Sequence, residues 1–594
     1  MTNPADAIGH LTPANWATAN RLLVRKALAE FSHERLLRPA SLGAGLYVLT
    51  CDDDSVEYRF AATIGKLDHW RIDADSIARY RAGRELPLDA VDLIIELRGQ
   101  LGLSERVLPT YLEEITSTLA STAFKLSRPE TSAADLARAD FQAIERGMTE
   151  GHPCFVANNG RIGFDADEYR AFAPEAGQPV RLVWVAARRD RATFTSCRDL
   201  DYAALVQGEL GAEVLRRFER VLAERGLELD EFLLIPVHPW QWANRLAVTF
   251  AGELAKGNLV FLGSGDDDYQ AQQSIRTFFN TSAPHRHYVK TALSVLNMGF
   301  LRGLSAEYMR DTPAINDWVA DLVADDPVLA GTGVAVLRER AAIGYHHEQF
   351  GAACAKGSPY LKMLAALWRE SPVPLLAPGE RLATMASLLH VDDAGNPLVG
   401  ALIAGSGLAA AEWVRRYLDA YLVPLLHCYY RYDLIFMPHG ENIILVLDEA
   451  GVPQRVILKD IGEEVAVMSD DLPLPPSVER IRAKVPAEIK ILSIFTDVFD
   501  CFFRFLASQL DTSGSLTEDE FWAVVADCVL GYQKSRPELA QRFAEDDLFA
   551  HEFALSCLNR LQLRDNQQMV DLADPAVALQ IVGTLANPLT PYRA

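Results

Sequence analysis

The residues best suited to chemistry in this chain are hydroxyl-bearing and cationic side chains gathered in residues 271–302, AQQSIRTFFNTSAPHRHYVKTALSVLNMGFLR. Two runs rich in aromatic and β-branched residues flank a turn at residues 281–284, which predicts a hairpin-like pair of strands. Side chains two apart on a strand share a face. We therefore expect Ser274 and Arg276 to point the same way, with Lys290 facing back toward Arg276.

Such a set could hold a polyphosphate and a carboxylate, because a guanidinium forms forked hydrogen bonds to phosphate oxygens and an ammonium adds a compact charge. The sequence has no glycine-rich Walker loop, so a nucleotide site must be built in this other way. The alternative is a polar sheet face open to water, since charged side chains are usually solvated. The members of the set are Ser274, Arg276, Thr277, Lys290 and Arg302.

A second polar group brackets an apolar hairpin in residues 437–464, MPHGENIILVLDEAGVPQRVILKDIGEE. Strands are predicted at 443–447 and 455–458, around a turn at 449–453. Because hairpin strands are antiparallel, the residues at the entrance return beside Asp460 at the exit. Carboxylate and amide oxygens so gathered suit magnesium, although solvated hairpin ends are the alternative. The entrance residues are His439, Glu441 and Asn442.

A third group lies in residues 151–164, GHPCFVANNGRIGF, here named the 151–164 loop. His152 precedes a proline and is biased to extended backbone, and Asn159-Gly160 is a strong turn signal. These features predict a tight loop with His152 and Arg161 on either side. A lone histidine is more often structural than catalytic, so both roles stay open on these residues alone.

Taken together, the three groups resemble the IucA/IucC family of siderophore synthetases, which act without a nonribosomal peptide synthetase. The resemblance covers nearly the whole chain and rests on the order and spacing of short motifs. The phrase EGHPCFVANNGRIGF is similar to the hydroxamate macrocycle branch, of the desferrioxamine and alcaligin synthetase type. The motifs are GHP at residue 151, HPWQ at 238–241, SIRT at 274–277, KTALS at 290–294, HGEN at 439–442, KD at 459–460 and ANPL at 586–589.

The resemblance implies a reaction in two halves. ATP adenylates a carboxylate with release of pyrophosphate, and an amine then attacks the acyl adenylate to give an amide and AMP. Arg302 would orient the carboxylate or stabilise charge as it develops.

Site roles follow from the same resemblance. Catalytic roles are expected for His152, Lys290 and Arg302. ATP would be bound by Ser274, Arg276, Thr277, Lys290, His439 and Asn442. The acyl substrate would meet His152, Asn158, Asn159, Arg161 and Arg302. Magnesium would be held by Glu441, Asn442 and Asp460.

The 151–164 loop departs from family members that use free citrate, which show a shorter HPxxKxRxGF pattern. Val156 stands where that lysine would fall, and the loop is lengthened by Asn158, Asn159 and Gly160. Losing a cation argues against a tricarboxylate, while the asparagine amides suit an acid that contains an amide or hydroxamate. We therefore expect an N-hydroxy-N-succinyl diamine, of the putrescine or cadaverine type, to be joined iteratively and closed into a macrocycle.

Composition narrows the class of protein. The chain has 80 acidic and 57 basic residues, a net charge of −23, which argues against nucleic acid and is compatible with a cationic amine substrate. No export signal is evident and no apolar run reaches ~18 residues, so we expect no membrane span. Eight scattered cysteines predict reduced, mostly buried thiols in a cytoplasmic protein. The family resemblance also implies a homodimer.

The predicted fold class is α+β, with several domains. Thr12 can cap a helix with Pro13 at its first position, and residues 45–71 alternate as strands do. A strand-rich centre and a helix-rich C-terminal part follow. The resemblance implies three domains, called the thumb (1–150), the fingers (151–330) and the palm (331–594). From about Leu425 the palm also resembles an FhuF-like ferric reductase segment, but without iron–sulfur cysteine spacing, so redox chemistry is not expected.

Two other classes of function remain. In small-molecule kinases an asparagine and a downstream aspartate hold magnesium, as Asn442 and Asp460 could. Kinases need a catalytic aspartate before that asparagine, and in the HGEN motif the carboxylate at that place is Glu441. A ferric-siderophore binding protein would need neither the phosphate-binding residues nor magnesium ligands.

Overall fold

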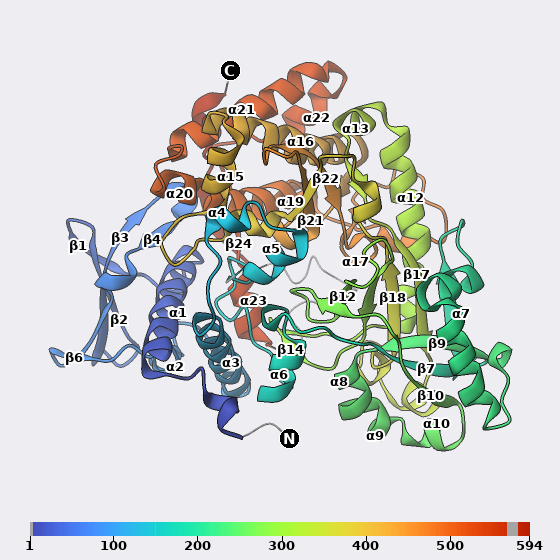
Figure 1. Cartoon of the computed structure of the whole chain (residues 1–594). Helices are drawn as coiled ribbons and strands as arrows, with labels where there is room; N and C mark the ends of the chain where they lie inside the picture. The colour runs from blue at the N-terminus through green and yellow to red at the C-terminus, as the bar shows by residue number, and fades with distance from the viewer. Residues whose placement is uncertain (1–3, 149, 567–579, 594) are drawn as a thin grey trace.

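The computed structural model describes residues 4–148, 150–566 and 580–593, and Figure 1 shows three regions. An N-terminal region in blue lies to one side, a strand-rich central region in green lies to the other, and C-terminal helices in orange and red lie above both. Helices and strands mix throughout, which confirms the predicted α+β class.

The N-terminal region packs helices against an antiparallel sheet. The predicted first helix is confirmed, because the Thr12 side chain accepts a hydrogen bond from the Asn15 N–H and Pro13 occupies the first turn. Its buried face, with Val24 and Phe31 fully inside, packs in one core with the sheet. The elements are α1 (Pro13–His33), α2 (Ala90–Glu96), α3 (Leu108–Leu126), α4 (Ala133–Leu136), α5 (Phe141–Gly147), β1 (Ala40–Gly43), β2 (Leu46–Thr50), β3 (Val56–Ile64), β4 (Trp70–Ile72), β5 (Ala78–Arg81) and β6 (Arg84–Leu86).

The central region contains two sheets, a three-stranded β10-β7-β9 and a six-stranded β11-β12-β13-β18-β17-β8. The larger sheet continues past residue 330, because β17 and β18 lie between β13 and β8. The strands are β7 (Val183–Arg188), β8 (Ala192–Ser196), β9 (Phe232–Val237), β10 (Leu259–Ser264), β11 (Tyr269–Ala271), β12 (Thr277–Asn280), β13 (Tyr288–Thr291), β14 (Leu296–Asn297), β15 (Phe300–Leu301), β17 (Glu339–Tyr345) and β18 (Ala365–Arg369). The helices are α6 (Ala166–Phe172), α7 (Tyr202–Ala223), α8 (Pro239–Gln241), α9 (Ala247–Thr249), α10 (Ala251–Ala255), α11 (Ala306–Met309), α12 (Thr312–Asp325), α13 (Pro327–Thr332) and α14 (Glu348–Ala353).

The C-terminal region holds the predicted hairpin inside a four-stranded sheet, β16-β22-β21-β19. Ile443 pairs with Leu458, so the hairpin prediction is confirmed. The strands are β16 (Ala335–Val336), β19 (Arg381–Thr384), β20 (Leu434–Ile435), β21 (Ile443–Leu447), β22 (Pro453–Leu458), β23 (Ala466–Val467), β24 (Glu552–Ser556) and β25 (Ile581–Ala586). The helices are α15 (Leu398–Ser406), α16 (Ala410–Tyr432), α17 (Ile461–Glu464), α18 (Ala487–Lys490), α19 (Leu492–Ile494), the π-helix η12 (Phe495–Phe503), α20 (Arg504–Thr512), α21 (Glu518–Ser535), α22 (Ala540–Glu545) and α23 (Leu558–Arg564).

A buried ion-pair network joins the N-terminal and C-terminal regions. Arg504 of α20 lies 2.9 Å from Glu30 of α1 and 2.9 Å from Asp500 of η12. His33 of α1 lies 3.1 Å from the same Asp500. These contacts fix α1 against the C-terminal helices.

Within the described ranges no single helix is long and apolar enough to cross a membrane. The helices α15 and α16 meet such a test only as a pair, across a bend of 106°. All eight cysteines are free thiols, and all but Cys354 are buried, as the sequence predicted.

Candidate active site

The predicted phosphate-binding residues surround the start of the β12–β13 hairpin. Thr277 and Lys290 are directly opposite each other across the two strands. Ser274 and Arg276 precede β12, and the chain turns between them at Ile275, whose φ is +59°. The prediction that Ser274 and Arg276 share one face of a strand is therefore wrong. The turn nevertheless groups the hydroxyls, since Ser274 Oγ donates to Thr277 Oγ1 at 2.8 Å.

Lys290 meets two carboxylates of the C-terminal region. Its Nζ lies 2.9 Å from Asp460 Oδ1 and also contacts the carboxylate of Glu463. The Arg276 guanidinium lies 3.9 Å from that same Glu463. Lys290 and Arg276 thus meet at Glu463, which the sequence did not indicate.

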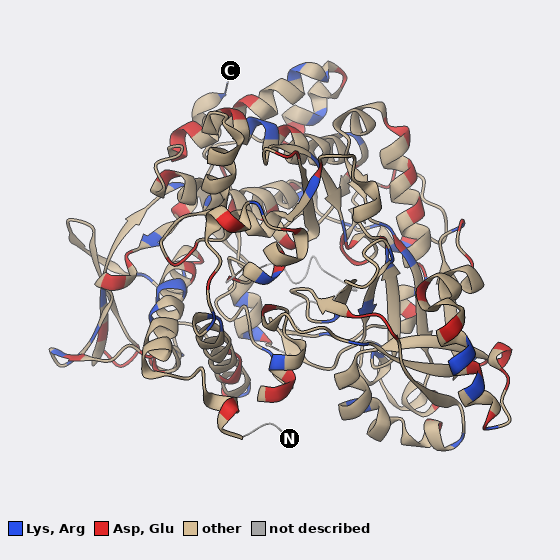
Figure 2. Ribbon diagram, viewed as in Figure 1, with Lys and Arg blue, Asp and Glu red and all other residues tan. Residues whose placement is uncertain are grey.

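Arg369 is a second cation that the sequence analysis missed. It closes β18 opposite Tyr288 of β13, and its guanidinium contacts Asp460 and lies 3.2 Å from Glu339. The one available signal was a cation at the end of the apolar run Ala365–Trp368, followed by a polar turn. Figure 2 shows acidic and basic segments side by side where α17, β17 and β18 meet.

The charges in this network hold one another ionised. Burial alone would raise the pKa of Asp460, but Arg369 and Lys290 more than offset it and hold that pKa below its usual range. Burial alone would lower the pKa of Lys290, but Asp460 and Glu463 raise it. A polyphosphate entering here would therefore exchange partners with carboxylates.

The two ends of the β21–β22 hairpin lie together as predicted, since the Lys459 N–H donates to the Asn442 carbonyl at 3.0 Å. His439 Nδ1 accepts the N–H of Glu441 at 3.3 Å. Asp460 follows with a left-handed backbone, φ +61°, where a non-glycine residue carries strain of roughly 1–3 kcal/mol. Strain of this kind persists only where surrounding structure imposes it, here through the contacts of Asp460 with Lys290 and Arg369.

Two carboxylates at this end have pKa values above their usual range. Burial and the neighbouring Glu145 raise the pKa of Glu441 to about 8. Burial and Asp460 raise the pKa of Glu464 to about 8, and Glu464 also contacts the Asn442 amide. In the part of the chain that the structure describes, no three Asp, Glu, His or Cys side chains form a ready metal site. The predicted magnesium set of Glu441, Asn442 and Asp460 stays a prediction.

The 151–164 loop lies against the hairpin end. The rings of His152 and His439 are 5.7 Å apart, so two groups distant in sequence share one site. Burial, with the nearby His439, holds the pKa of His152 well below its usual value. Burial lowers the pKa of His439 to about 4. Both rings are therefore neutral at pH 7.

The polar residues of the loop bond within the protein. Asn158 Nδ2 donates to the His152 carbonyl at 3.1 Å, and Asn159 Nδ2 donates to Ser121 Oγ at 2.7 Å. The guanidinium of Arg161 is buried 3.6 Å from Glu175. Contacts of Asn158, Asn159 and Arg161 with a substrate stay predictions.

Arg302 lies where positive charges crowd. Its terminal nitrogen donates to Asn297 Oδ1 at 2.7 Å. Burial, with the charges of Arg276 and Arg161, lowers the pKa of Arg302 to about 9. The described residues offer no hydrogen-bond partner to the buried Nε of any of these three arginines. Such a place fits an anionic group of a ligand.

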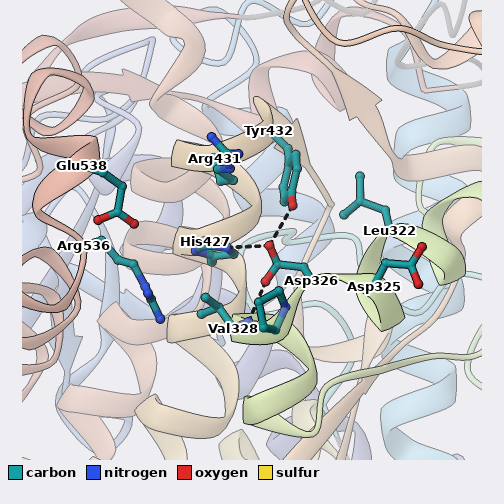
Figure 3. Close-up of a pocket in the computed structure, with 10 residues that line it drawn as sticks. Leu322, Asp325, Asp326, Val328, His427, Arg431, Tyr432, Arg536 and Glu538 are labelled. Carbon is teal, nitrogen blue, oxygen red and sulfur yellow. Dashed lines mark hydrogen bonds and ion pairs between the residues drawn. The ribbon is translucent and has the colours of Figure 1, made fainter.

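A separate cavity of about 480 Å³ lies between the end of α12, α13, α16 and the segment 536–538 that follows α21, and none of the predicted site residues lines it. Figure 3 shows His427 and Tyr432 directed at Asp326, with contacts of 3.1 and 2.7 Å. The buried polar groups of its floor are thus paired with one another.

The site described above gathers buried cations and carboxylates between a central sheet and a C-terminal hairpin. Residues 140–390 match the IucA / IucC family model. Residues 411–571 match the model described as a ferric iron reductase FhuF-like transporter. This match includes the segment from about Leu425 for which the sequence predicted the resemblance.

Similar proteins extend the match to nearly the full chain. A putrebactin synthase of Shewanella sp. (strain MR-4) is 53% identical over 98% of this chain and 93% of its own. The rhizobactin siderophore biosynthesis protein RhbF of Rhizobium meliloti (strain 1021) is 34% identical, over 97% of this chain and 96% of its own. The structure of aerobactin synthetase IucC from a hypervirulent Klebsiella pneumoniae pathotype matches with a TM-score of 0.85 and 29% identity, over 98% of this chain and 100% of that one. The chain belongs to the IucA/IucC family of siderophore synthetases.

Proposed function

We propose that this enzyme is an ATP-dependent ligase that joins N-hydroxy-N-succinyl diamines into a macrocyclic hydroxamate siderophore. The observation that carries the proposal is Arg302, crowded by Arg276 and Arg161 with unpartnered Nε atoms, which fits the carboxylate of an acyl substrate. The 53% identity with a putrebactin synthase supports the same substrate class.

ATP, when bound, supplies the adenylyl group that activates the carboxylate, with pyrophosphate as the first product and AMP as the second. Lys290 and Arg276 would hold the phosphates by leaving Glu463 and Asp460, with Ser274 and Thr277 as hydroxyl donors. His439 and Asn442 would contact the nucleotide.

Magnesium would be held by Glu441, Asn442 and Asp460. The fit rests on the donor types, which are carboxylate and amide oxygens. Burial and Glu145 raise the pKa of Glu441 to about 8, and a bound cation would lower it again. Glu464, beside Asn442, adds a further carboxylate.

The acyl side would be formed by Arg302 and His152. Arg302 orients the carboxylate and faces the charge that develops on it. His152 stays neutral at pH 7, and its Nδ1 accepts the backbone N–H of Cys154 at 3.4 Å, so its Nε2 carries the proton and can donate a hydrogen bond to the substrate without adding to the crowded positive charge.

The test is incubation with ATP, magnesium and the N-hydroxy-N-succinyl derivatives of putrescine and of cadaverine, followed by mass spectrometry. We expect AMP and pyrophosphate, with a linear dimer appearing before larger and cyclic products. ADP with a phosphorylated acid would point to a phosphotransferase instead. Binding of a ferric hydroxamate without turnover would point to a binding protein, and rapid adenylation of free citrate would overturn the substrate class.

We further propose a cytoplasmic homodimer, as the family resemblance implies. Sedimentation velocity of the purified chain should give twice the mass of 65.7 kDa. A species of 65.7 kDa at all concentrations would count against the dimer.

A further inference from the structure

Helix α3 of the N-terminal region presents a polar stripe to the 151–164 loop. Glu114, Ser117 and Ser121 are spaced three and four residues apart and so share one face of the helix. Ser117 Oγ accepts the backbone N–H of Arg161 at 2.9 Å, and Ser121 Oγ accepts the side chain of Asn159 at 2.7 Å. The loop is anchored on the helix at both sides of Gly160.

Gly160 packs tightly against α3. A Cβ added there would lie 2.3 Å from Cγ of Glu114, so a larger residue would displace the Glu114 side chain or the loop. The carbonyl of Gly160 accepts a hydrogen bond from Asn297 Nδ2 at 2.7 Å. This hydrogen bond fixes the Asn297 side chain relative to the tip of the loop.

The same Asn297 side chain also holds Arg302. Its Oδ1 accepts the guanidinium of Arg302 at 2.7 Å, and the side chain is 2% exposed. The Gly160 carbonyl needs a donor and the Arg302 guanidinium needs an acceptor, so the orientation of the Asn297 amide is fixed. Asn297 ends β14, which pairs with β15 around Met298 and Gly299 at φ +52° and +70°, values typical of a tight two-residue hairpin turn.

We propose that Gly160 and Asn297 are positioning residues that fix the guanidinium of Arg302, so that the 151–164 loop selects the acyl substrate through Arg302. The inference rests on the proposed function, in which Arg302 pairs with the substrate carboxylate. A neutral amide holds Arg302 without neutralising it, so the full charge stays available to a carboxylate ligand.

The test compares Asn297→Ala and Asn297→Asp with wild type. Misplacing a positioned group by about 1 Å can cost ~100-fold, so we expect the KM for the succinylated hydroxamate to rise tenfold to a hundredfold. Asn297→Asp keeps the size but places a carboxylate on Arg302 and loses the donor to the Gly160 carbonyl, so its KM for the acid should rise. The KM for ATP should be unchanged in both variants.

Asn20→Ala is the matched control. Asn20 is also a buried asparagine, bonded to the Trp16 carbonyl and to the Ala90 N–H, in the N-terminal region. Its loss should lower the melting temperature without changing either KM. If the KM for the acid and the KM for ATP change equally in the Asn297 variants, Asn297 has only a folding role and the inference is overturned.

A double-mutant cycle adds a measurement that a folding role would not alter. In an Arg302→Ala background, Asn297→Ala should produce no further rise in the KM of the acid, because its effect acts through Arg302. Additive effects would refute positioning. If the wild-type enzyme consumes no succinylated hydroxamate, the proposed function fails; if it does and Asn297→Ala leaves its KM unchanged, only this inference fails.

Discussion

Lys290 illustrates how single residues work in this site, because its cation is already shared by Asp460 and Glu463. A buried ammonium without those carboxylates would be driven to lose its proton. Its carboxylate partners therefore keep it charged. The same holds for Arg369, which contacts Asp460 from the neighbouring strand.

Lys290→Ala should lower kcat/KM about a hundredfold, because losing one preorganised charge contact costs ~3 kcal/mol in the transition state. Steady-state kinetics with pyrophosphate detection measures the change. Lys534→Ala, at an exposed position of α21, is the control and should match wild type. Unchanged kcat/KM for Lys290→Ala would exclude a contact with phosphate.

Asp460→Asn should shift the magnesium titration of activity to higher concentration, since a ligand charge is lost while its size is kept. Both Lys290 and Arg369 lose their shared partner in this variant, so the apparent affinity for ATP measured at saturating magnesium serves as an internal reference. A titration curve that coincides with wild type would count against Asp460 as a magnesium ligand.

At the scale of elements, local pattern was enough for the first helix and for the β21–β22 hairpin. Thr12, Pro13 and the turn at 449–453 carry their signals within a few residues. Arg369 and Glu463 were missed because their importance arises when β18 pairs with β13 and when α17 meets both strands. Arg369 pairs with Tyr288, 81 positions earlier, and Glu463 contacts Lys290, 173 positions earlier, so neither contact can be inferred from neighbouring residues in the sequence.

The side-chain contacts of the 151–164 loop could not be predicted from the local sequence either. A tight loop around Asn159-Gly160 was predicted, but the use of the Asn159 side chain was not. Its amide bonds to Ser121 on a helix that precedes the loop by many residues. The predicted contacts of Asn158 and Asn159 with a substrate stay predictions.

Helix α3 carries a buried acid whose titration can be measured. Burial raises the pKa of Glu114 from 4.5 to about 7. The folded state therefore binds more protons than the unfolded state between these values, and stability falls as pH rises from 4.5 to 7. The loss reaches about 3 kcal/mol and stays constant at higher pH.

Glu114→Gln should lack this loss, so its free energy of unfolding relative to wild type should improve steadily between pH 4.5 and 7. Urea denaturation at a series of pH values measures it. Glu113→Gln, on the exposed side of the same helix, should run parallel to wild type. Parallel curves for Glu114→Gln as well would mean that the carboxyl ionises normally.

For the whole molecule, the network around Arg504 ties the first helix to the last third of the chain. Arg504→Met leaves Glu30 and Asp500 buried without their partner, which should cost ~3–5 kcal/mol in the free energy of unfolding. Arg416→Met breaks an exposed pair with Glu412 and should cost about 0.5 kcal/mol or less. Similar losses in the two variants would show that the network does not hold the regions together.

The contact of Lys290 and Arg369 with Asp460 has a consequence for how this gene could be divided. The two matched family models meet between residues 390 and 411, and the cations lie before that point while the carboxylates lie after it. A gene fission there would separate Lys290 from Asp460 and Glu463, while Arg369 would lose Asp460 and keep Glu339. Neither fragment would be a smaller enzyme, and each would need the other to become soluble and active.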